Sequence, residues 1–489
     1  MQDWLSSRVQ ATPDTIAIID KNSGESLTYH ALHQQVFEQC VRWQRAGIQR
    51  GDHVGLIAQS NIETVLQIHT AFRMGVVLVP LNTRLTPDEM DFQLKQADVQ
   101  HILPYGSTDA LRVFRTRGHH VVLFDDEPID KITARQHAET QIDLAQPGLI
   151  VHTSGTTGKP KGAVLSNANL FYNAMASAYR IGHQTDDKWL CILPLYHVGG
   201  LSILVRAVLY GITVQLHSQF DIEQINQSLQ HDGITLISLV PTMLYRLLQH
   251  RETAWSSCLR LVLLGGAATS PQLMQQCLDE GIPVATTYGL TEAASQVATT
   301  LPGIAARKPG TVGKPLLFSR VRIVDEDGAD VPPNQHGEVI VRGKSVMMGY
   351  YDNPEATNSV IRDGWLHTGD IGYLDDDGDL WLVQRRSDLI VTGGENVYPV
   401  EVENVLRDHP AIQDVAVVGV VDDEWGERVG AAIVRKDDAT LDHDTVMSYA
   451  RQHLAGYKIP RVVMFTDELP QTASGKIKRP AVKALFEQA

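Results

Sequence analysis

Hydrophobic positions in the first 150 residues alternate between short apolar runs and segments with helical spacing. The apolar runs 53–58, 76–80 and 148–151 predict short buried strands. Residues 31–46 and 62–74 have the spacing of amphipathic helices, and each is followed by a glycine that can end a helix. Strands and helices alternate in this way when helices cover a parallel sheet. The N-terminal part of the chain is therefore predicted to be α/β.

The same alternation continues to about residue 264. Further helices are expected at 167–181, 201–209, 222–231 and 242–250, and further strands at 102–104, 121–124, 189–193, 213–217, 236–240 and 261–264. Because the series on either side of residue 150 are similar, they predict two stacked α/β subdomains.

From about residue 310 the pattern changes to strands separated by acidic, Gly- and Pro-containing turns. Strands are expected at 321–324, 338–341 and 380–383, which predicts a small β-barrel or meander. The acidic run 375–379 lacks the ligand spacing and the closing glutamate of a calcium loop, so it is interpreted as a hairpin turn.

The last part of the chain has its own helix and strand patterns. Helices are expected at 399–406 and 444–454, and strands at 415–418 and 431–434. Roughly 100 residues is a usual size for an independent domain. We therefore place a domain boundary near Ser387. The fold class expected is α/β, with a large N-terminal domain (1–386) of two subdomains plus the small β-barrel, followed by a small α+β C-terminal domain (387–489).

Composition narrows the class of protein. The 489 residues are 43% hydrophobic and 20% charged, which fits a globular chain. A formal net charge of −15 argues against a broad nucleic-acid or anionic-membrane surface. The four cysteines have no zinc or CxxC spacing, the N-terminus has no signal-peptide core, and no apolar run reaches the length of a membrane span. A cytoplasmic location is predicted, and a homo-oligomer is compatible with the sequence.

The stretch His152–Gly162, with the sequence HTSGTTGKPKG, directly follows the apolar run 148–151. Its glycines let backbone N–H groups turn toward an anion, its hydroxyl groups add donors, and its two lysines supply positive charge. The spacing between its glycines is not that of a Walker A loop. A loop that holds the phosphates of a nucleotide is the better interpretation, in preference to an ordinary surface turn.

This stretch closely resembles the phosphate-binding loop of the AMP-forming adenylating superfamily, which includes acyl- and aryl-CoA ligases, carrier-protein adenylation domains and luciferases. The resemblance recurs at later motifs and covers most of the chain. It implies ATP, Mg²⁺ and the co-substrate CoA. The nucleotide-binding residues that it implies in this loop and after the apolar run 261–264 are Thr153, Ser154, Gly155, Thr156, Thr157, Gly158, Lys159, Lys161, Gly265, Gly266 and Ala267, and Thr153 is also implied to be catalytic.

Two further segments resemble nucleotide motifs of the superfamily. Tyr288, Gly289, Leu290, Thr291 and Glu292 combine an aromatic face for adenine, a hydroxyl group for phosphate, and a carboxylate for Mg²⁺ and catalysis. In the segment 365–370, the resemblance implies that Asp370 accepts the ribose hydroxyls. Arg385 matches the arginine that reaches the ribose or phosphate, although Gln384 stands where relatives have Gly or Asp.

The C-terminal motifs imply a small domain that rotates between two half-reactions. The motif 470–479 contains SGKIKR, and its Lys476 is implied to stabilise the charge of the transition state at the α-phosphate. Gly393 and Gly394 match the segment that lines the pantetheine channel. The hinge falls on Ser387 or Asp388, and the sequence leaves the choice open. In relatives, the position of His197 lines the acyl pocket, although a lone histidine after a strand is more often structural.

The resemblance implies a two-step reaction: ATP and a carboxylate give an acyl-adenylate and pyrophosphate, and a thiol then displaces AMP to give a thioester. The segments 194–202, 239–244 and 385–396 are most similar to the branch that activates o-succinylbenzoate for menaquinone biosynthesis. Alternatives are a medium-chain fatty-acyl or other aryl-CoA ligase, an enzyme that adenylates for a separate carrier protein, and a nucleotide-binding relative without ligase activity. The presence of Lys476, Glu292 and Asp370 argues against the last of these.

Overall fold

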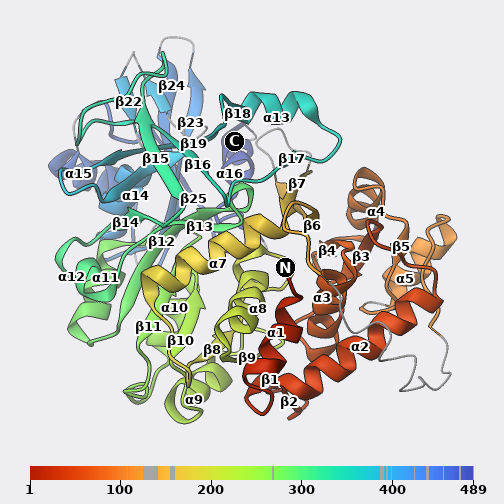
Figure 1. Cartoon of the computed structure of the whole chain (residues 1–489). Helices are drawn as coiled ribbons and strands as arrows, with labels where there is room; N and C mark the ends of the chain where they lie inside the picture. The colour runs from red at the N-terminus through yellow and green to blue at the C-terminus, as the bar shows by residue number, and fades with distance from the viewer. Residues whose placement is uncertain are drawn as a thin grey trace. The chain divides into compact units, whose positions relative to one another are not determined.

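The computed structural model places the chain in two compact units. It describes residues 1–106, 108–124, 141–154, 160–266, 269–385, 390–392, 395–397, 399–422, 425–436, 440–454, 456–472 and 475–487. The first unit comprises Met1–Ala268, Gln275–Val321 and Val341–Leu366, and the second comprises Thr269–Met274, Arg322–Ile340 and His367–Ala489. Figure 1 labels the helices and strands of both.

The first unit contains a six-stranded sheet in the order β17-β7-β6-β4-β3-β5. Its strands are β3 (His53–Ile57), β4 (Val77–Leu81), β5 (His101–Ile102), β6 (Pro147–Ser154), β7 (Pro160–Ser166) and β17 (Gly349–Tyr350), and the neighbouring helices are α2 (Tyr29–Arg45), α3 (Ile62–Met74), α4 (Pro87–Gln96) and α5 (Thr108–Thr116). The pairs β3–β4, β3–β5 and β4–β6 are parallel, whereas β6–β7 and β7–β17 are antiparallel.

Helix α3 shows how the sequence sets these elements. Its first turn is capped by Asn61, whose side chain accepts a hydrogen bond from the backbone N–H of Thr64, and it ends at Gly75 with a φ of 68°. Almost every side chain between these ends is buried. Helix α2 packs against it, with the indole of Trp43 donating to the side-chain oxygen of Gln67 at 2.9 Å. This bond gives the buried indole N–H an acceptor within the interface.

A second sheet of the first unit has the order β14-β13-β12-β11-β10-β8-β9-β1-β2. Its strands are β1 (Ile16–Asp20), β2 (Ser26–Thr28), β8 (Lys188–Cys191), β9 (Thr213–Leu216), β10 (Leu236–Leu239), β11 (Leu261–Leu264), β12 (Val284–Leu290), β13 (Ser295–Thr299) and β14 (Thr311–Pro315). The helices between them are α7 (Asn167–Ile181), α8 (Val198–Tyr210), α9 (Ile222–His231), α10 (Pro241–Gln249), α11 (Pro271–Asp279) and α12 (Pro302–Arg307). The inner strands are parallel, and β12–β13 and β13–β14 are antiparallel.

The N-terminal segment fixes the C-terminal end of α8. Helix α1 (Trp4–Ala11) carries Arg8, whose guanidinium donates to the carbonyl oxygens of Val208 at 2.9 Å and Leu209 at 2.5 Å. The Tyr29 hydroxyl bonds the carbonyl oxygens of Ala207 and Ile212 at 2.8 and 2.7 Å. The Arg8 contacts satisfy carbonyl groups in the last turn of α8, which a helix end leaves without intrahelical partners. Two side chains from the N-terminal part of the chain therefore hold the C-terminal end of α8 in place.

The second unit contains strands that neighbour one another in the order β15-β16-β19-β20, and a separate sheet in the order β22-β21-β24-β23, with β25 paired to β24. The strands are β15 (Ser319–Val324), β16 (Gly337–Gly343), β19 (Trp365–Leu374), β20 (Leu380–Arg385), β21 (Ile390–Thr392), β22 (Glu395–Val397), β23 (Ile412–Asp422), β24 (Gly426–Arg435) and β25 (Val462–Phe465). Helices α14 (Pro399–Arg407) and α15 (His443–His453) cover the second sheet, and α16 (Arg479–Glu487) follows the last strand.

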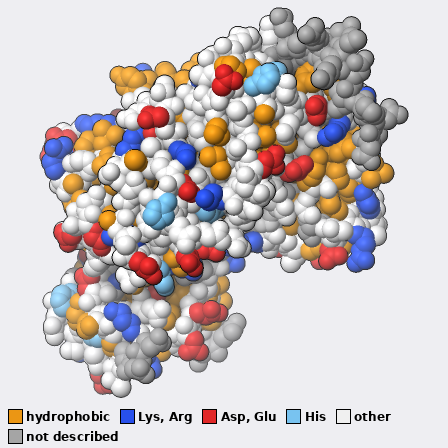
Figure 2. All heavy atoms as spheres, turned by 90° about the horizontal axis from the view of Figure 1, so that it is seen from below, with side chains coloured by type: hydrophobic (Ala, Val, Ile, Leu, Met, Phe, Trp, Pro, Cys, Tyr) orange, Lys and Arg blue, Asp and Glu red, His pale blue; other side chains and the backbone are white. Residues whose placement is uncertain are grey.

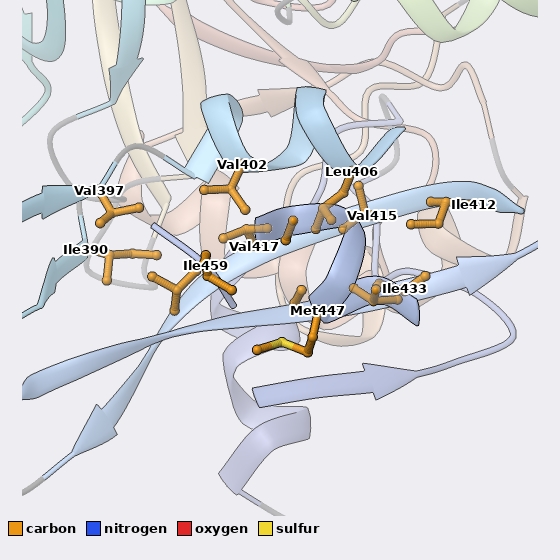
Figure 3. Packing of buried hydrophobic residues seen from close by; sticks show 14 of the residues in the cluster. Ile390, Val397, Val402, Leu406, Ile412, Val415, Val417, Ile433, Met447 and Ile459 are labelled. Atoms are coloured by element: carbon orange, nitrogen blue, oxygen red, sulfur yellow. The ribbon is translucent and has the colours of Figure 1, made fainter. Parts of the chain in front are cut away.

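The C-terminal sheet has its own hydrophobic core. Figure 3 shows Val402 and Leu406 of α14 directed toward Val415 and Val417 of β23, with Met447 of α15 in the same cluster. All five side chains are almost completely buried. This separate core agrees with the predicted α+β C-terminal domain. The predicted boundary near Ser387 falls in residues 386–389, outside the described part, and the boundary stays a prediction.

Most predicted elements are present. Helices α3, α7 and α9 and strand β11 have the predicted bounds. The strand predicted at 121–124 is wrong: only Val121 forms an isolated bridge to Ile102, and Leu123 is 75% exposed, so this apolar run does not enter the sheet. Helices α1, α11, α12, α13 (Pro354–Val360) and α16 and the hairpin β1–β2 were not predicted.

Charged side chains of both signs lie on the surface. On the face drawn in Figure 2, Lys and Arg side chains lie among Asp and Glu side chains. No helix in the described ranges has the length and hydropathy needed to cross a bilayer. All four cysteines are free thiols; Cys40, Cys191 and Cys277 are buried and Cys258 is exposed.

Candidate active site

The predicted phosphate loop connects the two antiparallel strands β6 and β7. Thr153 pairs with Lys161 across this hairpin, and its hydroxyl lies 3.5 Å from the carbonyl oxygen of Lys161. Both predicted site residues are therefore held by the strand pairing at the ends of the loop. The side chain of Ser154 and the loop residues Gly155, Thr156, Thr157, Gly158 and Lys159 lie outside the described residues.

His152, directly before the loop, does not add a positive charge to it. Burial lowers the pKa of His152 to about 4, so its ring is neutral at pH 7. Within this stretch, positive charge for a phosphate is therefore left to the lysines.

Glu292 lies on a tight turn between β12 and β13, in the 3₁₀ segment Thr291–Ala293. Strand pairing brings Gly289 so close to β13 that a Cβ at this position would lie 1.8 Å from the carbonyl oxygen of Ser295. Ala294 and Ser295 adopt φ angles of 59° and 146°, which residues other than glycine rarely adopt. The turn that carries Glu292 is thus determined by one obligatory glycine and two unfavourable backbone angles.

The side chains of Glu292 and Lys161, from separate elements, both lie beside Tyr350. The hydroxyl of Tyr350, on strand β17, donates to the Glu292 carboxylate at 2.9 Å. The ammonium of Lys161 lies 5.4 Å from the centre of the Tyr350 ring, within range of a cation–π interaction. Backbone pairing supports this arrangement, because Tyr350 is opposite Ala163 on β7 and the Met347 N–H donates to the Glu292 carbonyl at 2.8 Å. The first unit therefore places an acidic and a basic predicted site residue around one tyrosine.

The donor groups at this place fit Mg²⁺. The carboxylate of Glu292 and the hydroxyl group of the neighbouring Thr291 are hard oxygen donors, the type that Mg²⁺ prefers. Tyr350 contacts one carboxylate oxygen, Oε1. Such a contact fixes the orientation of a carboxylate that holds a metal through its other oxygen.

The remaining nucleotide-site predictions in the first unit lie on neighbouring strand ends. Gly265 follows β11, where a Cβ would lie 2.7 Å from the Thr287 side chain of β12. Tyr288 and Leu290 lie on β12, and Tyr288 is buried. Gly266 has a φ of 82°, and Ala267 lies outside the described residues. Because β11 and β12 are adjacent parallel strands, both segments lie at one sheet edge.

His197 occupies the N-cap position of α8, directly before the helix. Its half-buried ring meets the ring of Tyr196 edge-on, with 4.7 Å between centroids. The helix approaches the loop that follows β8 closely, because a Cβ on Gly200 would lie 2.4 Å from the Pro194 carbonyl oxygen. The residues 194–200 thus form a rigid turn around His197.

Arg206, further along α8, is a charged residue that was not predicted to belong to the site. It is 1% exposed, donates to the Asn173 side-chain oxygen at 3.1 Å and to the Ser295 hydroxyl at 3.3 Å, and lies 5.6 Å from the ring of Trp189. Burial lowers its pKa, and within the described part of the chain no carboxylate forms an ion pair with it. The sequence does contain a signal that could have identified it, because Arg206 is the sole charged residue in the helix 198–210.

Asp370 and Arg385, both in the second unit, are opposite each other in the strand pair β19–β20. Asp370 is 7% exposed, and its backbone N–H donates to the Thr368 hydroxyl at 3.1 Å. The adjacent His367 ring contacts Glu338 at 2.9 Å. The strand pairing therefore brings the two predicted ribose and phosphate residues together, and the side chain of Arg385 lies outside the described residues.

Lys476 lies in a turn that the backbone closes on itself. The Thr472 N–H donates to the Lys476 carbonyl at 2.7 Å, and the Lys476 N–H donates to the Thr472 hydroxyl at 3.1 Å. Gly475 has a φ of 77°, and the Lys476 side chain is exposed. The charge is thus presented to solvent from a fixed turn. Gly393 and Gly394 and the hinge candidates Ser387 and Asp388 lie outside the described residues.

The chain belongs to the AMP-binding enzyme family. Residues 5–351 match that family, and residues 401–476 match the AMP-binding enzyme C-terminal domain.

Two groups of known proteins are similar over nearly the whole chain. The 2-succinylbenzoate–CoA ligase of Bacillus mycoides (strain KBAB4) is 38% identical over 489 residues, covering 100% of this chain and 99% of that protein. The o-succinylbenzoate CoA synthetase (MenE) from Bacillus subtilis, solved in complex with the acyl-adenylate intermediate OSB-AMP, is 34% identical with a TM-score of 0.89 over 99% of this chain and 98% of that chain. ATP-bound MatB from Rhodopseudomonas palustris is 29% identical with a TM-score of 0.90, over 100% and 99%.

Proposed function

We propose that this chain is an AMP-forming carboxylate–CoA ligase that converts o-succinylbenzoate to o-succinylbenzoyl-CoA. The observation that carries the nucleotide chemistry is the arrangement of Glu292, Tyr350 and Lys161 beside the β6–β7 hairpin. It supports a site where a carboxylate and an ammonium act on one polyphosphate. Similarity to 2-succinylbenzoate–CoA ligases over 100% of the chain supports the same conclusion.

In the first step a carboxylate oxygen of the acid attacks the α-phosphorus of ATP, and the bond to pyrophosphate breaks. In this proposal Glu292 holds Mg²⁺, which neutralises phosphate charge when bound. Lys161 and the loop hold the phosphates, and the Asp370 carboxylate accepts hydrogen bonds from the ribose hydroxyls. The exposed Lys476 supplies positive charge at the α-phosphate. Catalysis is then mainly positioning and charge neutralisation.

In the second step the thiolate of CoA attacks the acyl carbon, AMP leaves with the oxygen, and the thiol proton is released to solvent. We assign this step to the face that carries Gly393 and Gly394, after a rotation of the domain 387–489. The four free thiols support an activity in a reducing compartment, the cytoplasm.

The buried guanidinium of Arg206 supports a dianionic acid. o-Succinylbenzoate keeps one carboxylate after the other is adenylated, and a buried anion needs a cationic partner. Arg206 contacts Ser295, three residues after Glu292 on the same hairpin, so its charge is linked to the turn of the nucleotide site. A long fatty-acyl chain has no group that requires this charge.

The test is a panel of acids with Mg·ATP and purified protein, with pyrophosphate and AMP release measured with and without CoA. CoA-dependent turnover with o-succinylbenzoate, and little with octanoate or benzoate, is expected. Turnover only with fatty or simple aryl acids would retain the two-step chemistry and overturn the substrate. Pyrophosphate release that CoA does not stimulate would indicate a carrier protein as acceptor, and no release with any acid would overturn the ligase.

A further inference from the structure

Arg479, the last residue of the SGKIKR motif, is directed into the C-terminal sheet. Its guanidinium donates to both carboxylate oxygens of Glu403, at 2.5 and 3.2 Å, and to the carbonyl oxygen of Val417 at 2.6 Å. Glu403 is 2% exposed, and it also accepts from the Val417 N–H at 2.8 Å. The two-pronged pair therefore joins the first turn of α16 to both α14 and β23, the two elements whose packing Figure 3 shows.

The residues from Lys476 to Arg479 alternate between solvent and protein. Lys476 and Lys478 are exposed, whereas Ile477 packs against the hydrophobic cluster that includes Val418 and Val482. Ile477 also forms a bridge with Gln471, which closes the turn. Two inward side chains thus hold a short segment whose outward side chains are Lys476 and Lys478.

We infer that Arg479 is a positioning residue for Lys476, and that the Arg479–Glu403 pair fixes the turn that presents the Lys476 ammonium to the α-phosphate. This inference rests on the proposed function. A planar guanidinium bound to both carboxylate oxygens fixes direction as well as distance, which a single contact does not. Since Arg479 is only three residues from Lys476, loss of the pair is expected to let the turn shift.

Arg407 provides a matched control on the same carboxylate. It lies one turn from Glu403 on α14, contacts it at 3.8 Å, and donates to the Val415 carbonyl at 3.2 Å. Removing Arg407 therefore perturbs the same ion cluster and the same packing, but no contact joins it to the segment 476–479 in the described contacts.

The test compares the two half-reactions in Arg479→Met, Glu403→Gln, Arg407→Met and Lys476→Ala. Adenylation is measured as pyrophosphate release from o-succinylbenzoate and Mg·ATP without CoA, and thioester formation is measured from presynthesised acyl-adenylate and CoA. Arg479→Met is expected to slow adenylation by about 100-fold, as small misplacements of a reacting group do, and to leave thioester formation within about threefold of wild type. Lys476→Ala is expected to give the same selective loss, and Arg407→Met almost none.

Glu403→Gln keeps the shape of the side chain and is expected to show a smaller loss of the same selectivity, which keeps the inference testable if Arg479→Met does not fold. Arg479→Lys restores the charge without the fork and is expected to recover only part of the rate. Normal adenylation in folded Arg479→Met or Glu403→Gln, or an equal loss in both half-reactions, would overturn the inference. Absence of pyrophosphate release in the wild type would instead overturn the proposed function, and this inference with it.

Discussion

The side chains around Glu292 make the proposed Mg²⁺ site dependent on a residue far away in sequence. Tyr350, 58 residues from Glu292, orients one carboxylate oxygen at 2.9 Å. We predict that Tyr350→Phe raises the Mg²⁺ concentration needed for half-maximal adenylation by about 10- to 100-fold, the usual cost of losing a partner of a metal ligand. The measurement is the rate of pyrophosphate release against free Mg²⁺.

Tyr351 is the control for this prediction, because its hydroxyl donates to Asp98 at 3.0 Å rather than to Glu292. Tyr351→Phe is expected to leave the Mg²⁺ dependence unchanged. A Mg²⁺ curve for Tyr350→Phe that overlays the wild-type curve would show that the hydroxyl does not orient the ligand.

Arg206 makes opposite predictions for stability and for substrate binding. Because it is 1% exposed and has no carboxylate partner in the described residues, replacing it with an apolar side chain removes a buried charge. We predict that Arg206→Met leaves the unfolding midpoint unchanged or higher, while the KM for o-succinylbenzoate rises at least about 100-fold, the cost of removing one partner of a buried charge pair. The KM for ATP is expected to stay near the wild-type value.

The measurement pairs thermal unfolding with steady-state kinetics. Arg180→Met, which removes a guanidinium from the adjacent helix α7, is the control and is expected to affect the KM for the acid little. A strongly destabilised Arg206→Met with unaltered KM would mean that Arg206 serves packing alone.

At the scale of elements, the hairpin β12–β13 leaves no room for a side chain at Gly289. A Cβ at Gly289 would meet the Ser295 carbonyl oxygen at 1.8 Å, so one strand must move. We predict that Gly289→Ala lowers the unfolding midpoint and slows adenylation by about 100-fold or more, because the turn with Glu292 shifts. Circular dichroism melting and pyrophosphate release are the measurements.

Gly303 is the matched glycine. It lies in helix α12, and a Cβ there meets no atom within 4 Å, so Gly303→Ala is expected to be neutral or slightly stabilising. If Gly289→Ala behaved like Gly303→Ala, the close approach of the two strands would not constrain the site.

Local patterns predicted the elements and contiguous motifs, and they failed where contacts are distant in sequence. Helix α3 could be predicted from its own periodicity, and Glu292 could be selected from the contiguous motif 288–292. Tyr350 could not be selected, because nothing in the pair Tyr350–Tyr351 indicates which ring faces Glu292 and which faces Asp98. Likewise, SGKIKR identified Lys476, but only the fold shows Arg479 bound to Glu403, 76 residues earlier.

At the scale of the whole molecule, buried histidines set the response of the first unit to acid. His69 on α3 is buried near Arg73 and Asp3, and burial lowers its pKa from 6.5 to about 4. The unfolded chain therefore binds a proton between these pH values that the folded chain does not, so stability falls as pH falls from about 6.5 to 4. This group contributes up to about 3 kcal/mol to that loss.

His69→Gln removes this proton uptake, and its urea midpoint is expected to depend less on pH between 7 and 4.5 than that of the wild type. His250→Gln, at an exposed position, is expected to leave the pH dependence unchanged. Identical pH dependence in His69→Gln and the wild type would assign the acid response to other groups. Among these is Asp3, whose pKa stays lowered by Arg73 despite the opposing effect of burial.

The α/β fold class of the whole molecule was predicted from the sequence. The change of pattern near residue 310 and the separate C-terminal core are both visible in the sequence. Yet residues 322–340 and 367–385 cluster with the C-terminal residues in space. A local pattern carries no information about such grouping, because it depends on which strands of the chain pair with one another.

The four thiols differ in burial, so one exposed cysteine, Cys258, is available for labelling with a thiol-reactive probe. Burial raises the pKa values of Cys40, Cys191 and Cys277 to about 12, so these groups remain protonated thiols, whereas Cys258 is exposed. A maleimide dye should therefore label the wild-type chain once, in the first unit. With one cysteine introduced in the second unit, fluorescence energy transfer would test the proposed domain rotation without any cysteine having to be removed.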